Sequence, residues 1–240
     1  MTSRERVLAA LRHEQPDRTP RDFWAEPPTM QRLFAHVGHS YKDRLLDALD
    51  VDVRHLEAPA PVEREVAPGL FQNFWGERYV FNPTPWGPMR EDAKGALADA
   101  TDLAALEKFP WPSPDCLDRK GMTALIHSLG GRALYHSCGT IRPFIADLIA
   151  CGVDVLDPIQ PTGPEMQPES LKREFGDRLC FHGGIDMQNL LPKATPAAVT
   201  TGAQHYCDVL GQNGGYILGP AHLFQPDVPP ENILALYQAR

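Results

Sequence analysis

Long apolar runs are absent from this sequence of 240 residues. None approaches the roughly 18 residues that a membrane-spanning helix needs, and no signal-peptide core follows the N-terminal Met-Thr-Ser-Arg-Glu-Arg-Val. Internal repeats and low-complexity tracts are also absent. We therefore expect a cytoplasmic globular protein that does not act at a membrane.

Positive charge and cysteine are both scarce. Lysine and arginine number 23 against 31 aspartate and glutamate residues, which gives a net charge of −8. A protein that wraps nucleic acid is usually basic, so this balance argues against a nucleic-acid partner. The cysteines are odd in number and widely spaced, which argues against a disulfide framework; they are Cys116, Cys138, Cys151, Cys180 and Cys207.

What the sequence does contain divides near its middle. All four tryptophans lie before residue 120, whereas 14 of the 19 glycines follow it. We predict one domain over residues 1–240. Its N-terminal part, 1–120, holds helices and a β-hairpin arm at 62–88, and its C-terminal part, 121–240, alternates strands with helices.

The alternation in the C-terminal part indicates a parallel sheet with right-handed crossovers. A (β/α)8 barrel and an open doubly wound sheet both fit, but no Gly-x-Gly-x-x-Gly follows a strand, which weakens a dinucleotide-binding interpretation. The N-terminal part adds one barrel-type strand, so the parallel units reach about five of the eight in a barrel. The expected strands are 51–56, 132–136, 153–156, 178–182 and 215–218, and the expected helices are 2–11, 41–49, 101–108, 120–129, 141–149, 169–175, 195–210 and 227–237.

The sharpest motif is His136-Ser-Cys-Gly139, at the carboxyl end of a predicted strand. Residues two apart on a strand project to the same face, so the imidazole of His136 and the thiol of Cys138 can converge. Imidazole and thiolate are natural zinc ligands, and parallel α/β folds place their sites at the carboxyl ends of strands. The pair alone is a weak signal, because a zinc site needs a third ligand.

His222 is the best candidate for that third ligand. It follows the last predicted strand through Gly219-Pro-Ala221 and therefore reaches the same rim. Three protein ligands and one open position are the arrangement of a catalytic zinc. The alternative, a loop histidine hydrogen-bonded to backbone, stays open at this point.

Two carboxylates also end predicted strands, Asp157 in Leu-Asp-Pro and Asp186 in Gly-Gly-Ile-Asp. Either could orient a metal-bound histidine or a substrate group, or could serve as a turn residue or helix cap. His182 shares a strand face with Cys180, which imitates the His-x-Cys spacing, but both lie inside the strand and we interpret them as core packing. His55 has no convincing partner in the sequence.

From residue 132 onward the sequence resembles the uroporphyrinogen decarboxylase superfamily almost continuously. The fold that this resemblance implies is a distorted (β/α)8 barrel, in agreement with the alternation above; because the chain is short for the family, we expect an incomplete or distorted α/β barrel. Family members are longer than this chain, which implies that a stretch is missing between Trp111-Pro-Ser-Pro114 and Lys120. The segments that carry the resemblance are His136-Ser-Cys-Gly139, residues 152–161, 171–179, 183–186, 214–222 and 225–233, together with 4–11 and 16–20 near the N-terminus.

Two chemistries compete within that superfamily. The decarboxylases carry an arginine-rich segment after an Arg-x-Pro, which grips substrate carboxylates, whereas here Arg18-Thr-Pro20 is followed by Arg-Asp-Phe-Trp-Ala-Glu-Pro-Pro. The corrinoid-linked methyltransferases carry a His-x-Cys zinc pair, as this sequence does. The third ligand of that branch is commonly a cysteine near the last strand, where this sequence has His222.

The resemblance to the methyltransferase branch implies Zn²⁺ as cofactor, a small thiol as substrate, and a corrinoid such as methylcobalamin, carried on a partner protein, as methyl donor. The resemblance does not decide whether the protein forms homo-oligomers. Two rivals remain: a metal-free uroporphyrinogen decarboxylase of porphyrin biosynthesis, and a truncated barrel without catalytic activity. The implied roles are metal ligation by His136, Cys138 and His222, catalysis by Asp186, and substrate binding by Asp157 and Gln160.

Overall fold

A computed structural model describes residues 1–55, 64–72, 77–85, 87–94, 101–108 and 132–239. The chain divides into two compact units, one formed by residues 1–55 and 126–240 and the other by residues 56–125. The helix expected at 120–129, the stretch expected to be shortened and Cys116 all lie outside the described residues. No helix in the described part of the chain is long and apolar enough to cross a membrane.

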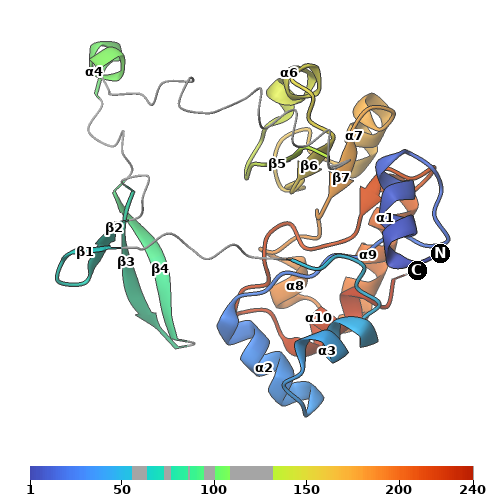
Figure 1. Cartoon of the computed structure of the whole chain (residues 1–240), viewed down its shortest axis with the longest axis horizontal. Coiled ribbons are helices and arrows are strands. Elements are labelled where there is room, and N and C mark those ends of the chain that lie inside the picture. The colour runs from blue at the N-terminus through green and yellow to red at the C-terminus, as the bar shows by residue number, and fades with distance from the viewer. Residues whose placement is uncertain (56–63, 73–76, 86, 95–100, 109–131, 240) are drawn as a thin grey trace. The chain divides into compact units, whose positions relative to one another are not determined.

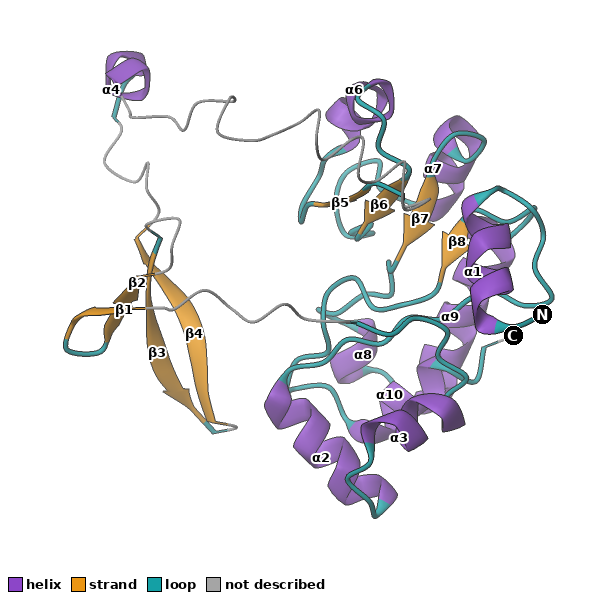
Figure 2. Ribbon diagram, viewed as in Figure 1, coloured by secondary structure: helices purple, strands orange, loops and turns teal. Residues whose placement is uncertain are grey.

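The first unit is built around a parallel sheet in the order β5-β6-β7-β8 (Figures 1 and 2). This confirms the four predicted strands, each shorter than expected. Helices follow the strands as predicted, except for the short α8, which the sequence did not predict. The strands are β5 (Leu134–His136), β6 (Val155–Asp157), β7 (Cys180–His182) and β8 (Tyr216–Ile217), and the helices after them are η2 (Arg142–Phe144), α6 (Ile145–Ala150), α7 (Pro168–Phe175), α8 (Leu190–Lys193), α9 (Pro196–Leu210) and α10 (Pro230–Leu236).

The N-terminal segment extends this sheet beyond β8. The amide of Asp22 donates to the carbonyl of Leu218 at 2.8 Å, and the amide of Leu218 donates to the carbonyl of Pro20 at 2.8 Å. One step further, the amide of Asp52 donates to the carbonyl of Arg21 at 2.9 Å. Two extended segments, around Arg21 and Asp52, therefore follow β8 in backbone hydrogen bonding, but the strand predicted at 51–56 does not form over the described residues 51–55, which belong to no strand or bridge. Within the described residues the result is an arc of strands and not a closed barrel.

Three helices precede or separate these segments: α1 (Ser3–Leu11), α2 (Pro27–Val37) and α3 (Lys42–Ala48). The capping box predicted at the start of α1 is present, because Thr2 Oγ1 accepts from the Glu5 amide while Glu5 Oε2 accepts from the Thr2 amide. The sequence did not predict α2, which begins at two prolines without a side-chain cap. The main core lies between the sheet and helices such as α7, α9 and α10, with fully buried Leu156, Phe181 and Ile233.

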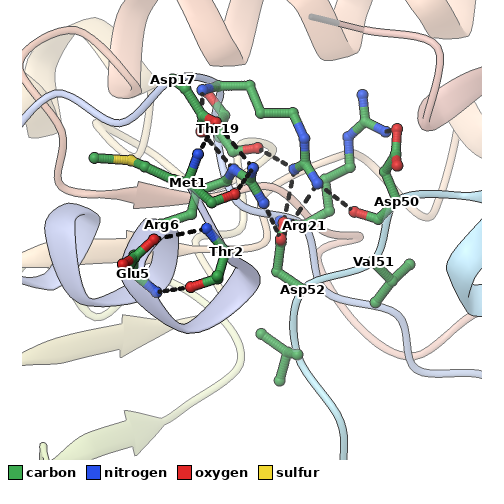
Figure 3. A network of polar contacts seen from close by, with 12 residues as sticks. Met1, Thr2, Glu5, Arg6, Asp17, Thr19, Arg21, Asp50, Val51 and Asp52 are labelled. Carbon is green, nitrogen blue, oxygen red and sulfur yellow. Dashed lines mark hydrogen bonds and ion pairs between the residues drawn. The ribbon is translucent and has the colours of Figure 1, made fainter.

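A network of ion pairs around the buried Asp52 ties α1 to both extended segments, as Figure 3 shows. The side chain of Asp52 is fully buried, and it accepts from Arg6 Nη1 at 2.5 Å and from Arg18 Nη1 at 2.6 Å. Its Oδ2 also accepts from the backbone amide of Arg21 at 3.0 Å. Arg6 in turn binds Asp17 through Nε at 2.6 Å. One carboxylate therefore joins three stretches of the N-terminal region.

The second unit contains an antiparallel sheet in the order β1-β2-β3-β4. Over the described residues this agrees with the β-hairpin arm predicted at 62–88, and the sheet continues past 88 to the end of the fourth strand at Lys94. The helix expected at 101–108 is present as α4 (Leu103–Lys108). The strands are β1 (Arg64–Ala67), β2 (Leu70–Gln72), β3 (Arg78–Thr84) and β4 (Gly87–Lys94).

Replacing Asp52 by alanine is expected to lower the free energy of unfolding by about 3 kcal/mol, because the buried guanidinium of Arg6 and the partly buried one of Arg18 then lose their common partner. Urea unfolding followed by circular dichroism measures the change. The matched control is Asp47→Ala, since Asp47 pairs with Arg54 while 71% of its side chain is exposed; its effect should stay below about 1 kcal/mol. Equal losses of stability in the two variants would contradict the conclusion that the ion pairs of Asp52 stabilise the N-terminal region.

Candidate metal centre

His136 is the last residue of β5, and Cys138 lies two residues beyond it. The chain turns sharply after the thiol, since Gly139 has a φ of 90°, in the region that favours glycine. The amide of Gly139 donates to Oε1 of Gln160, which holds this turn against the loop that follows β6. His136 Nε2 lies 3.7 Å from Cys138 Sγ, close to the ~3.5 Å that separates two ligand atoms in a tetrahedral zinc site.

His222 reaches the same place from beyond β8. The connection is fixed by a parallel bridge between Ile185 and Pro220 and by the amide of Ala221, which donates to the carbonyl of Ile185 at 2.8 Å. One ligand atom each from His136, Cys138 and His222 lie within 4.8 Å of one another. The structure thus brings together the three residues predicted as ligands.

The chemistry of these donors fits a zinc ion. Two imidazoles and a thiol are borderline ligands of the kind that zinc prefers over calcium or magnesium. Nδ1 of His222 is buried and has no hydrogen-bond partner among the described residues. A buried imidazole nitrogen without a partner is unfavourable, so a group that binds Nδ1 of His222 would remove this cost. The backbone hydrogen bond left open for His222 is therefore not present at Nδ1.

Behind His136 runs a chain of alternating histidines and aspartates, which we call the histidine–carboxylate array. Nδ1 of His136 lies 2.6 Å from Asp157 Oδ2, and the other oxygen of Asp157 lies 2.5 Å from Nδ1 of His182. Nε2 of His182 lies 3.0 Å from Asp22 Oδ2, and Oδ1 of Asp22 lies 2.8 Å from Nε2 of His55. The array thus joins β5, β6 and β7 to both N-terminal extended segments.

Hydrogen bonding outweighs burial in setting the charges of the array. Burial alone would lower the pKa of His182, but its hydrogen bonds to Asp157 and Asp22 raise that pKa to about 9. Burial also opposes ionisation of Asp22, yet the hydrogen bonds from His182 and His55 hold its pKa well below the usual range. The pKa of Asp157 is lowered for the same reasons, and the hydrogen bond to Asp22 raises the pKa of His55. At neutral pH His182 is therefore an imidazolium between two carboxylates.

The array and His222 line one cavity of about 540 Å³ in the first unit. Trp24 stacks on His55 at its wall, with the two rings 5.7 Å apart and nearly parallel. The remaining lining is mostly apolar and includes Val7, Leu11, Val53, Leu134, Val155, Ile217 and Pro220, together with Arg132. A cavity of this size can hold a small organic ligand with its reactive group at the metal-ligand cluster.

The residues predicted to bind substrate or act in catalysis have defined partners in the structure. Both oxygens of Asp157 are engaged by histidines, and Gln160 holds the turn at Gly139. Asp186 Oδ1 accepts from the amides of Gln188 and Asn189 at 2.7 and 3.3 Å, a loop cap at the start of α8. Direct roles of these three residues toward a substrate stay predictions.

Sequence reasoning missed three residues of the site. His182 was interpreted as core packing, which is wrong, although its neighbour Cys180 is indeed fully buried in the core. His55 was left without a partner, and Asp22 was not considered. The sequence did offer one signal, which is position along the strands. His136 pairs in register with Asp157, and His182, the last residue of β7, ends the next strand at the corresponding position.

The stability of the metal-free protein should depend on pH through His182. Its pKa in the folded state is raised from 6.5 to about 9, so the stabilisation is complete below pH 6.5 and is lost as the pH rises through about 9. The free energy of unfolding of the wild type, relative to His182→Gln, should fall over this interval by on the order of 3 kcal/mol. Urea titrations at several pH values measure the difference; a difference that does not change with pH would contradict the assigned charge.

Comparison with known proteins agrees with this architecture. Among solved structures, a methyltransferase from Methanosarcina mazei is similar to this chain, with a TM-score of 0.59 and 15% sequence identity over 99% of this chain and 98% of that chain. At this identity the similarity shows a shared α/β fold. No curated protein matches the chain. Residues 120–240, just over half of the sequence, match the family described as uroporphyrinogen decarboxylase (URO-D), and the chain therefore belongs to the uroporphyrinogen decarboxylase family.

Proposed function

We propose that this protein is a zinc-dependent methyltransferase that transfers a methyl group from a corrinoid to a small thiol. The observation that carries the proposal is the convergence of His136, Cys138 and His222, of which the two histidines line a mostly apolar cavity. The two-histidine, one-thiol donor set favours zinc, and three protein ligands leave a fourth position for a substrate. The likeness in fold to the Methanosarcina methyltransferase is consistent with this branch of the family.

In this proposal the three ligand residues hold the metal, and Asp157 orients the ring of His136 through Nδ1. When bound, zinc would lower the pKa of a substrate thiol so that the thiolate, the actual nucleophile, is available at neutral pH. When present, the corrinoid would supply the methyl group that the thiolate sulfur accepts, and its cobalt–carbon bond would break with the electron pair left on cobalt. The apolar walls of the cavity exclude water from the reacting sulfur. A corrinoid protein is the expected partner, and Asp186 is retained as a candidate catalytic residue at the loop after β7.

The alternative of metal-free porphyrinogen decarboxylation needs cationic groups that grip several substrate carboxylates. The arginines around the Arg-x-Pro motif are committed elsewhere. Arg18 binds the buried Asp52, and Arg21 donates to the carbonyls of Leu49 and Ala239 at 3.0 and 2.7 Å. Neither of these two lines the cavity, whose described cationic side chain other than histidine is Arg132. This distribution favours the methyltransferase.

The purified protein should contain about one zinc ion per chain, because three convergent ligands suffice for tight binding. His136→Ala and Cys138→Ser should each remove most of the metal, since two ligands make a poor site. Elemental analysis after dialysis measures the content. The control is Cys151→Ser, a second exposed cysteine away from the cluster, which should keep its zinc. Full occupancy in Cys138→Ser would remove Cys138 from the site.

Methyl transfer from free methylcobalamin to a small thiol should occur, should require zinc and should stop with a chelator. His222→Ala should reduce zinc content and rate together, whereas His222→Cys should keep both, because thiolate also binds zinc. The reaction is measured by the loss of the methylcobalamin absorption spectrum. Zinc binding without transfer to any of several thiols would indicate a protein that has kept its metal without the activity. Turnover of a porphyrinogen without metal would establish the decarboxylase.

A further inference from the structure

His182 occupies an unusual position between two carboxylates. Its Nδ1 lies 2.5 Å from Asp157 Oδ1 and its Nε2 lies 3.0 Å from Asp22 Oδ2, while only 13% of its side chain is exposed. A neutral imidazole has one N–H and can donate to only one acceptor, whereas the imidazolium donates from both nitrogens. Two ionised carboxylates therefore require the charged ring.

The groups around His182 agree with that charge. Asp157 approaches from β6 and Asp22 from the N-terminal segment beside β8, and the side chain of Asp22 is 5% exposed. Two further titratable groups share these carboxylates: His55 lies on the far side of Asp22, and His136 lies on the far side of Asp157. A cation between two buried anions needs no other compensation, and removing it would leave both carboxylates with less neutralisation.

The charge of His182 has a consequence for the metal-ligand cluster. It holds Asp157 as a carboxylate whose second oxygen accepts a hydrogen bond from Nδ1–H of His136. With the proton on Nδ1, the lone pair of His136 lies on Nε2, the nitrogen 3.7 Å from Cys138 Sγ. A carboxylate that accepts a hydrogen bond from the second ring nitrogen of a metal-bound histidine sets the tautomer, the orientation and the basicity of that histidine.

We propose that His182 is a positioning residue for the metal centre: as an imidazolium held between Asp22 and Asp157, it fixes Asp157 on Nδ1 of His136 and so presents Nε2 of His136 to the metal. This inference rests on the proposed function, because it concerns the same ligand cluster. It assigns to His182 an effect on metal binding that acts through two intervening side chains and involves no contact with the metal.

The first test uses the metal-free protein. In the wild type labelled with ¹⁵N-histidine, NMR at pH 7.5 should show both ring nitrogens of His182 protonated, and Asp22→Asn should lower the pH at which this state is lost. Comparison with His182→Gln assigns the signal. A neutral ring in the wild type, or no change in Asp22→Asn, would overturn the proposal independently of any metal.

The second test measures binding of Co²⁺, a spectroscopic substitute for zinc, to the full-length chain. His182→Gln should bind Co²⁺ about 10- to 100-fold more weakly than the wild type, and the visible spectrum of its bound Co²⁺ should shift because the orientation of His136 is no longer fixed. A purely structural role would lower stability and leave this spectrum unchanged. The matched control is His205→Gln, a surface histidine that pairs with Glu169 while 52% exposed, and it should bind like the wild type.

The outcomes separate this inference from the proposed function. A folded His182→Gln protein with wild-type affinity and spectrum overturns only the role of His182. A wild-type protein that binds neither Co²⁺ nor zinc overturns both. Should His182→Gln fail to fold, Asp22→Asn, which retains the ring and nearly the same shape, takes its place in the titration; a wild-type affinity and spectrum in that variant would again overturn the positioning role.

Discussion

The placement of His182 between Asp22 and Asp157 is the constraint on which the rest of the site depends. The three side chains come from β7, from the N-terminal segment and from β6, so each pair can form only when these strands are in register. A charge buried at this depth is stable only beside its partners. The charges in the cavity are therefore stable only when the strands are aligned, and the aligned strands in turn bring these charges together.

The N-terminal region meets this requirement through a second set of charges. Asp22 reaches the cavity because the backbone around it pairs with Leu218, and that pairing is backed by the buried carboxylate of Asp52 with its arginines. Arg18 binds Asp52, and Arg21 donates to the backbone carbonyls of Leu49 and Ala239, so both arginines hold this region in place. The cavity consequently receives one carboxylate, Asp22, and one imidazole, His55, from this region, together with the apolar surface of Trp24.

Local patterns in the sequence predicted much of the fold and the three candidate ligands. Strand–helix alternation and caps act over a few residues, and His136 and Cys138 are placed by the period of one strand. His222 was predicted because β8 had to end at the same rim. The histidine–carboxylate array was not predicted, since Asp22 and His182 are 160 positions apart in the sequence and no local period relates them. Only the register between strands makes them neighbours, and α2 was missed because it begins at prolines that also suit a loop.

The order of the three ligands along the chain has a consequence during synthesis. His222 is made 84 residues after Cys138, an interval of roughly 4 to 17 s at bacterial and eukaryotic rates of translation. Throughout it, an exposed thiol at the end of β5 has one imidazole beside it and lacks the third donor of the cluster. Thiols are most readily oxidised when they are accessible and uncoordinated. Under the proposed zinc binding, Cys138 stays uncoordinated until His222 has been made, so the nascent chain is the form in which its exposed thiol is most vulnerable to oxidants.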